Sequence, residues 1–215
     1  MERDDAEFSG MGQDEARRHV TREEFTIDPT ARPAWLPDFI EVNMPDNHSN
    51  LVLIGMPGAG KSTIGVLLAK RLQRNFLDTD LLIQVAEGRS LQDIVDTQGD
   101  QALRDLEAET ILGLNPTNHV IATGGSAVYS DPAMQHLRRH GRILFLRVDL
   151  ETLAQRLRNF ETRGIARKPG QSLRELFEER NALYEQYADL TCECSHLAPE
   201  QICDAILATL SCSLA

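Results

Sequence analysis

Residues 55–62 have the composition of a phosphate-binding loop. Their sequence, Gly-Met-Pro-Gly-Ala-Gly-Lys-Ser, matches the pattern G-x-x-x-x-G-K-[S/T]. The glycines allow consecutive backbone N–H groups to curl around phosphate oxygens, and a helix that starts near Gly60 adds the positive end of its dipole. Lys61 would reach the β- and γ-phosphates, and the Ser62 hydroxyl can ligate Mg²⁺. The alternative is a glycine-rich turn before a chance lysine, but the strand pattern before the loop and the helix pattern after it favour nucleotide binding.

Two carboxylates, Asp78 and Asp80, follow the second expected strand. In an open parallel sheet, ligands bind at the carboxyl ends of the strands, and side chains two residues apart point the same way if the strand persists. We therefore expect both carboxylates to face one site. One would hold Mg²⁺, and the other would accept a proton from an attacking hydroxyl or orient it. The alternative is that an aspartate here caps the next helix.

A glycine pair and three arginines complete the candidate site. Residues 123–126, Thr-Gly-Gly-Ser, follow the third expected strand, where the glycines either allow close approach of a ligand or form an ordinary turn. Arg104, Arg163 and Arg180 lie in segments that can face the same sheet edge, and arginine binds a carboxylate through two parallel N–H groups. The alternative is that these arginines lie on solvated helix faces and pair with neighbouring glutamates such as Glu107.

Strand-like and helix-like stretches alternate from residue 50 onward. The apolar run 51–54 ends in glycine and is typical of a strand buried on both faces, and residues 60–73 carry apolar side chains at helical spacing. The alternation predicts an α/β fold, in which helices cover both faces of a parallel sheet. The expected strands are 51–54, 76–80, 119–123, 142–147 and 189–192, and further helices are expected near 90–97, 100–113, 131–140, 150–159, 172–187 and 199–211.

The composition excludes several classes of protein. The chain has 215 residues, a net charge of −11 and 41% hydrophobic residues, which is enough for a domain with its own core. The acidic balance argues against nucleic acid or an anionic membrane as a partner, because both need a basic face. The N-terminus lacks the apolar stretch of a signal peptide, and no apolar run approaches about 18 residues. We therefore expect a cytoplasmic protein with reduced thiols.

Residues 1–48 differ from the rest of the chain. They contain 12 acidic residues, 5 basic residues and four prolines, which predicts a mostly extended arm. The single tryptophan, Trp35, lies in the apolar stretch 35–40, which we expect to dock on its own domain or on a partner. We therefore divide the chain into an N-terminal extension, residues 1–48, and a nucleotide-binding domain, residues 49–215.

The order of the motifs resembles that of shikimate kinase. The phosphate-binding loop continues as Gly-Lys-Ser-Thr-Ile-Gly, and the later motifs are 78–80 (Asp-Thr-Asp), 103–107 (Leu-Arg-Asp-Leu-Glu), 122–125 (Ala-Thr-Gly-Gly) and 179–184 (Glu-Arg-Asn-Ala-Leu-Tyr). The resemblance runs from about residue 50 to about residue 210. It implies a three-layer αβα P-loop kinase with a five-stranded parallel sheet of order 2-3-1-4-5. It also implies ATP, Mg²⁺ and phosphorylation of shikimate to shikimate 3-phosphate, a step in the biosynthesis of aromatic amino-acid precursors.

The resemblance assigns acceptor-side roles by position. Asp80 matches the aspartate that binds substrate hydroxyls and is the candidate base. Arg104 and Arg180 match the pair that grips the substrate carboxylate. Gly124 and Gly125 match the glycine loop on the substrate side.

On the nucleotide side, Asp78 matches an aspartate near Mg²⁺, which Ser62 would also ligate. Arg156 aligns with an arginine that packs on adenine, and Arg163 aligns with the lid arginine that reaches the transferring phosphate. Nucleotide contacts are implied for Gly58, Ala59, Gly60, Lys61, Ser62 and Thr63. The candidate catalytic residues are therefore Lys61, Asp80 and Arg163.

The chain departs from the family pattern in two places near the acceptor. Ser126 stands where the family has a third glycine, and the lid near 160–171 reads Arg-Gly-Ile-Ala-Arg-Lys-Pro-Gly over residues 163–170. Arg167 is a second candidate for the lid arginine, although the alignment favours Arg163. Because the lid closes over the substrate, these changes bear on the identity of the acceptor more than on the reaction.

Three alternatives follow. The leading one is a shikimate kinase, the second is a kinase of the same build for another small hydroxy acid or polyol, and the third is a nucleotide-binding module whose arm docks a partner. The partner expected from the first two is a small molecule. We expect a monomer, with association through the arm as the alternative.

Overall fold

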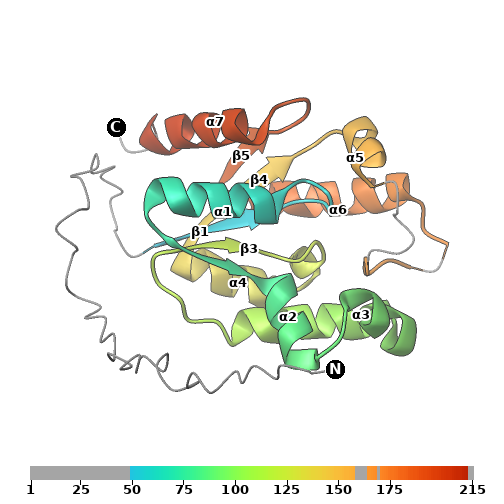
Figure 1. The fold of residues 1–215 in the computed structure, drawn as a ribbon. Coiled ribbons are helices and arrows are strands. Elements are labelled where there is room, and N and C mark those ends of the chain that lie inside the picture. Colours follow the sequence, from blue (N-terminus) through green and yellow to red (C-terminus); the bar gives the residue numbers. More distant parts are fainter. Residues whose placement is uncertain (1–48, 158–163, 169, 213–215) are drawn as a thin grey trace, which may run out of the picture. The chain divides into compact units, whose positions relative to one another are not determined.

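The computed structural model describes residues 49–157, 164–168 and 170–212. The arm, with Trp35, lies outside the described residues. Within them, five parallel strands form one sheet with the order β2-β3-β1-β4-β5 (Figure 1). The predicted sheet and its strand order are therefore confirmed. The strands are β1 (Asn50–Ile54), β2 (Asn75–Asp78), β3 (His119–Ala122), β4 (Gly141–Arg147) and β5 (Leu190–Glu193).

Helices cover both faces of this sheet, as the alternating pattern predicts. In Figure 1, α1 and α7 pack together over one face, and α3, α4 and α6 lie over the other. The helices are α1 (Lys61–Leu72), α2 (Thr79–Glu87), α3 (Leu91–Leu112), the 3₁₀ turn η1 (Ala127–Tyr129), α4 (Asp131–His140), α5 (Leu150–Arg156), α6 (Leu173–Tyr187) and α7 (Pro199–Cys212). None of the helices in these described ranges is long and apolar enough to span a membrane.

The core lies on both sides of the central strands. Every residue of β1 is buried, and the middle of β4 is buried as well. Each fully buried aliphatic side chain in such a strand contributes about 1.5–3 kcal/mol to folding. The side chain of Asn50 joins three strands at their amino ends: its Nδ2 donates to the carbonyls of Pro116 and His140, and its Oδ1 accepts from the His119 N–H. These contacts hold the amino ends of β1 and β3 beside the residue that precedes β4.

The structure corrects the expected path after β2. The strand ends at Asp78 and does not persist to Asp80, because Asp78 caps the helix α2. The expected strand to residue 80 is wrong, and the alternative, in which an aspartate caps the next helix, is confirmed. Asp78 Oδ1 accepts from the backbone N–H groups of Asp80 (3.0 Å) and Leu81 (3.3 Å). Asp80 therefore lies in the first turn of α2, and its direction is set by a helix rather than by strand alternation.

The stretches predicted as separate helices at 90–97 and 100–113 form the two arms of α3. Gly99 has φ 88° and ψ 171°, which is not a helical conformation, and the helix bends there. The bend separates the arm that begins after the capping box of Ser90 from the arm that carries Arg104 and Glu107.

Candidate active site

The P-loop, residues 55–62, connects β1 to α1 in a conformation that favours glycine. Gly58 and Gly60 have φ angles of 81° and 97°. Lys61 Nζ donates to the carbonyl oxygens of Gly55 (2.8 Å) and Met56 (3.1 Å). Burial lowers the pKa of Lys61 below its ordinary value, and the nearby carboxylate of Asp80 opposes that shift. The amine is therefore held inside the curl of the loop, where a bound phosphate would meet it.

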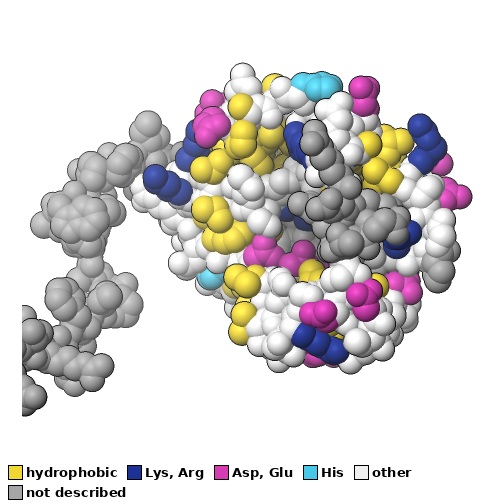
Figure 2. Space-filling model, turned by 45° about the vertical axis from the view of Figure 1, so that its right-hand side comes forward, with side chains coloured by type: hydrophobic (Ala, Val, Ile, Leu, Met, Phe, Trp, Pro, Cys, Tyr) yellow, Lys and Arg dark blue, Asp and Glu magenta, His cyan; other side chains and the backbone are white. Residues whose placement is uncertain are grey.

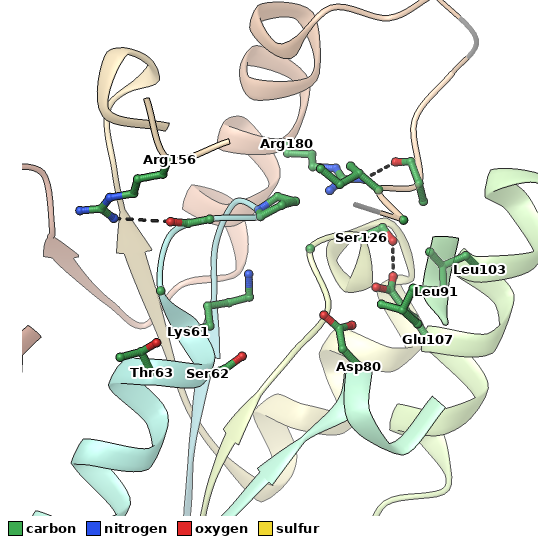
Figure 3. Close-up of a pocket in the computed structure, with 17 residues that line it drawn as sticks. Lys61, Ser62, Thr63, Asp80, Leu91, Leu103, Glu107, Ser126, Arg156 and Arg180 are labelled. Atoms are coloured by element: carbon green, nitrogen blue, oxygen red, sulfur yellow. Dashed lines mark hydrogen bonds between the residues drawn. The ribbon is translucent and has the colours of Figure 1, made fainter. Parts of the chain in front are cut away.

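A cavity of about 520 Å³ opens beside the P-loop at the carboxyl edge of the sheet. Figure 2 shows acidic side chains beside a hollow on this side of the molecule, and Figure 3 shows the cavity between the P-loop and the α2–α3 pair. Predicted nucleotide-contact residues that line it are Gly58, Gly60, Lys61, Ser62, Thr63 and Arg156. Ala59 is buried and does not line the cavity. The lining also includes Asp80, Gly125 and Arg180 from the predicted acceptor set.

Two carboxyl groups converge on the acceptor side of this cavity. Within the described part of the chain, Asp80 Oδ1 is buried and has no hydrogen-bond partner. Burial raises the pKa of Asp80, and Lys61 opposes the shift. Burial, with the charge of Asp80, raises the pKa of Glu107 to about 7. A Cβ at Gly124 would overlap Glu107 and lie 2.7 Å from Asp80 Oδ1, so this position requires glycine.

Ser126, the residue in place of the family's third glycine, lies against Glu107. The Ser126 hydroxyl donates to Glu107 Oε2, and both side chains are buried. Figure 3 shows this pair next to Asp80. The sequence also allowed Glu107 to pair with an arginine. The structure shows instead that Glu107 is hydrogen-bonded to Ser126. The N–H of Gly124 donates to Thr79 Oγ1 at 2.9 Å, which fixes the glycine loop on the start of α2.

The two predicted carboxylate-binding arginines both contact Tyr129. Arg180 is 1% exposed. Its Nε donates to Tyr129 Oη at 3.4 Å, and its Nη2 donates to the carbonyl of Ala166. The Arg104 guanidinium lies 4.0 Å from the centre of the Tyr129 ring. Arg104 lines an adjoining pocket of about 580 Å³ rather than the central cavity, and Ser126 lines both.

The remaining predicted site residues are placed as follows. Asp78 is the helix cap described above and does not line the cavity, so its metal role stays a prediction. Arg156 Nη1 reaches the carbonyl of Gly58 at 3.5 Å. Arg163 lies outside the described residues, and its role also stays a prediction. The other lid candidate, Arg167, donates to the carbonyl of Gln171 at 3.0 Å.

Comparisons with known proteins agree with this geometry. A family model described as shikimate kinase matches residues 57–211. The chain belongs to the shikimate kinase family. It is 39% identical to a shikimate kinase of Pseudomonas paraeruginosa over 75% of this chain and 95% of that relative, and 41% identical to one of Rippkaea orientalis over 74% of this chain and 86% of that relative.

Solved structures of the shikimate kinase family have the same fold. The enzyme from Acinetobacter baumannii, solved in complex with shikimate, superposes with a TM-score of 0.71 at 31% identity and covers 77% of this chain and 94% of that one. The enzyme from Aquifex aeolicus superposes with a TM-score of 0.67 at 30% identity, covering 77% and 98%. The predicted family and its small-molecule kinase fold are therefore confirmed.

Sequence reasoning missed two features of this family member's site. Tyr129 carries no sequence motif, although it contacts both arginines. Ser126 stands out in the sequence only as a departure from the family pattern, and the direction of its hydroxyl depends on the loop that follows β3. Arg104 and Glu107 are three residues apart, and this spacing places both side chains on one face of a helix. The sequence therefore did contain a signal that Glu107 lies near Arg104.

Proposed function

We propose that this chain transfers the γ-phosphoryl group of ATP to a hydroxyl of shikimate. The observation that carries the proposal is the unpartnered, buried Asp80 carboxylate oxygen, which faces the same cavity as the P-loop. A hydroxyl hydrogen-bonded to Asp80 would lie between that carboxylate and the loop that binds phosphate. The family membership and the shikimate-bound relative support the choice of acceptor.

On the nucleotide side, the chain supplies positioning and positive charge. The N–H groups of the P-loop would bind phosphate oxygens, and Lys61 would exchange its two carbonyl partners for the β- and γ-phosphates. Arg156, on the rim beside Gly58, would pack against the base. Phosphoryl transfer needs little covalent help from a protein, so placement and charge neutralisation are the main contributions.

On the acceptor side, Asp80 would orient the attacking hydroxyl and accept its proton. Burial raises the pKa of Asp80, which makes its carboxylate a stronger proton acceptor, and the neighbouring Lys61 opposes that shift. Arg180 would bind the acceptor carboxylate, because it lines the cavity beside Gly125. Gly164, Ile165 and Ala166 line the cavity on the lid side, and closure of the lid over the acceptor would limit access of water.

The residues present fit Mg²⁺, the ion implied by the family. Ser62 offers an exposed hydroxyl at the start of α1, and Asp78 offers the carboxylate oxygen that it does not use in the helix cap. Oxygen ligands of this kind suit Mg²⁺, which usually keeps several waters and binds through one or two side chains and the phosphates. When bound, the ion would neutralise charge on the phosphates.

The test is ADP release from Mg·ATP with shikimate, quinate, gluconate or homoserine as acceptor. The proposal predicts release that depends on shikimate. Turnover with another acceptor and none with shikimate would keep the kinase and overturn the substrate. ATP binding without turnover on any acceptor would overturn the kinase assignment and favour the binding-module alternative.

A further inference from the structure

Tyr129 is in contact with both arginines of the predicted carboxylate clamp. The Arg104 guanidinium lies 4.0 Å above the centre of its ring, and the Arg180 guanidinium lies 5.3 Å from the same centre. The Tyr129 hydroxyl accepts a hydrogen bond from Arg180 Nε at 3.4 Å. One side chain, at the end of the turn η1, thus contacts two cations that come from different helices, α3 and α6.

The Arg104 guanidinium has few other constraints. Its Nε and Nη2 are buried, and neither has a hydrogen-bond partner among the described residues. The nearest carboxylate, Asp100, lies 3.5 Å from Nη2 and is one helical turn away, which makes a weak ion pair. The face of the Tyr129 ring is therefore the main contact that sets the plane of this guanidinium. Its N–H donors stay available to an anion.

The same tyrosine also connects the arginines to the lid side. Glu179 lies near its hydroxyl, and that carboxylate accepts from Gln171 Nε2 (2.7 Å) and Lys168 Nζ (3.3 Å). Arg180 in turn donates to the carbonyl of Ala166. Ala166 therefore contacts Arg180 directly, and Lys168 and Gln171 contact Glu179 beside Tyr129.

We propose that Tyr129 is a positioning residue that orients Arg104 and Arg180 toward the carboxylate of the acceptor. Two guanidinium groups near one another repel, and the negative face and the hydroxyl of the tyrosine compensate that repulsion before the acceptor arrives. The pair is thereby preorganised, and binding of the carboxylate does not bear the cost of ordering two long side chains. This inference rests on the proposed function, because it assumes an acceptor with a carboxylate.

Tyr129→Leu and Tyr129→Phe test the proposal. Leucine removes the ring and the hydroxyl, and should raise the acceptor KM about 10-fold, the effect of losing a partly buried cation–π contact and a hydrogen bond. Phenylalanine keeps the ring and should recover part of the loss. The KM for ATP should stay within about 2-fold of wild type, as expected for a contact confined to the acceptor side. Equal rises in both KM values would indicate a structural defect and overturn the proposal.

Tyr187→Phe is the matched control. Its hydroxyl donates to Asp131 Oδ1 at 2.8 Å, and among the described residues Tyr187 has no hydrogen bond or ring contact with Arg104 or Arg180. Removing this bond lowers stability by an amount similar to the loss in Tyr129→Phe, but should leave the acceptor KM unchanged. An acceptor KM that rises as much in the control as in Tyr129→Phe would contradict a positioning role.

A double-mutant cycle with Arg104→Ala separates positioning from direct binding. If Tyr129 acts through Arg104, then Tyr129→Leu should have a much smaller effect on the acceptor KM in the Arg104→Ala background. Fully additive effects would overturn the proposal while leaving the kinase activity intact.

Failure of the proposed function would give a different result: wild-type protein would then give no ADP release with shikimate and no heat of binding when shikimate is titrated into the Mg·ADP complex. That result would remove both proposals together.

Discussion

Arg180 is the residue whose replacement should separate acceptor binding from nucleotide binding. It is buried, and it lines the cavity beside Gly125. Arg180→Lys keeps the charge but removes the planar pair of N–H donors, and a lost charged hydrogen bond costs about 1.5–3 kcal/mol. We expect the acceptor KM to rise roughly 10- to 150-fold, with the KM for ATP unchanged. An unchanged acceptor KM in steady-state assays would contradict the carboxylate-binding role of Arg180.

Glu107 should make the stability of the protein depend on pH. Burial and the charge of Asp80 raise its pKa from 4.5 to about 7, so the folded chain binds this proton more tightly than the unfolded chain. The stabilisation is complete below pH 4.5 and is lost as the pH rises through about 7. Because one pKa unit corresponds to about 1.4 kcal/mol, the free energy of unfolding should fall by up to about 3 kcal/mol across this window.

Glu107→Gln removes this titration and keeps the shape of the side chain. Its melting temperature, compared with that of wild type, should be similar at pH 5 and higher at pH 8. Glu109→Gln, on the exposed side of the same helix, should show no such change between the two pH values. A Glu107→Gln difference that is the same at both pH values would contradict the raised pKa.

At the scale of elements, the bend of α3 decides where Arg104 and Glu107 lie. Gly99 has a backbone conformation with positive φ, and a Cβ there would meet no atom within 4 Å. Gly99→Ala therefore tests backbone strain without a clash, and it should lower the free energy of unfolding by about 1–3 kcal/mol in denaturant titration.

Gly113→Ala is the control for that change. Gly113 follows the same helix with φ −78°, and its added Cβ would make only ordinary contacts at 3.5 Å. We expect it to be neutral or slightly stabilising. Equal losses in the two variants would show that the bend at Gly99 carries no special conformational requirement.

The sequence predicted the elements that carry a periodic apolar pattern. The strand at 51–54 is a short apolar run before glycine, and residues 60–73 have helical spacing; the structure has β1 and α1 there. The helix at 79–87 is not among the helices expected from apolar spacing, because the strand pattern was extended to Asp80. The sequence offered a strand to Asp80 or a helix cap at this aspartate pair, and the side chain of Asp78 forms the cap.

At the scale of the whole molecule, the sheet, both helical layers and the cavity lie within the described residues after residue 48. We therefore expect a chain lacking residues 1–48 to retain kcat and both KM values within about 2-fold, because a core of this size folds without an appendage. Steady-state kinetics of the shortened chain provide the test. Loss of turnover in a folded, shortened chain would show that the arm contributes to the site.

The candidate site was predictable only in part. The P-loop and Asp80 could be located because their chemistry is encoded in a local pattern beside a sheet edge. The contacts of Ser126 with Glu107, and of Tyr129 with Arg104 and Arg180, join segments far apart in the chain. Such contacts depend on tertiary packing, which the spacing of residues within one sequence does not reveal.

The most direct test of the central claim is to identify the product by ³¹P NMR after incubation with Mg·ATP and shikimate. The account predicts that wild-type protein forms a phosphate ester of shikimate in amounts equal to the ADP released. Asp80→Asn should form almost none, although it should still bind ATP, because the hydroxyl has lost its proton acceptor. Free phosphate as the only product, or an unchanged rate of ester formation in Asp80→Asn, would contradict the account.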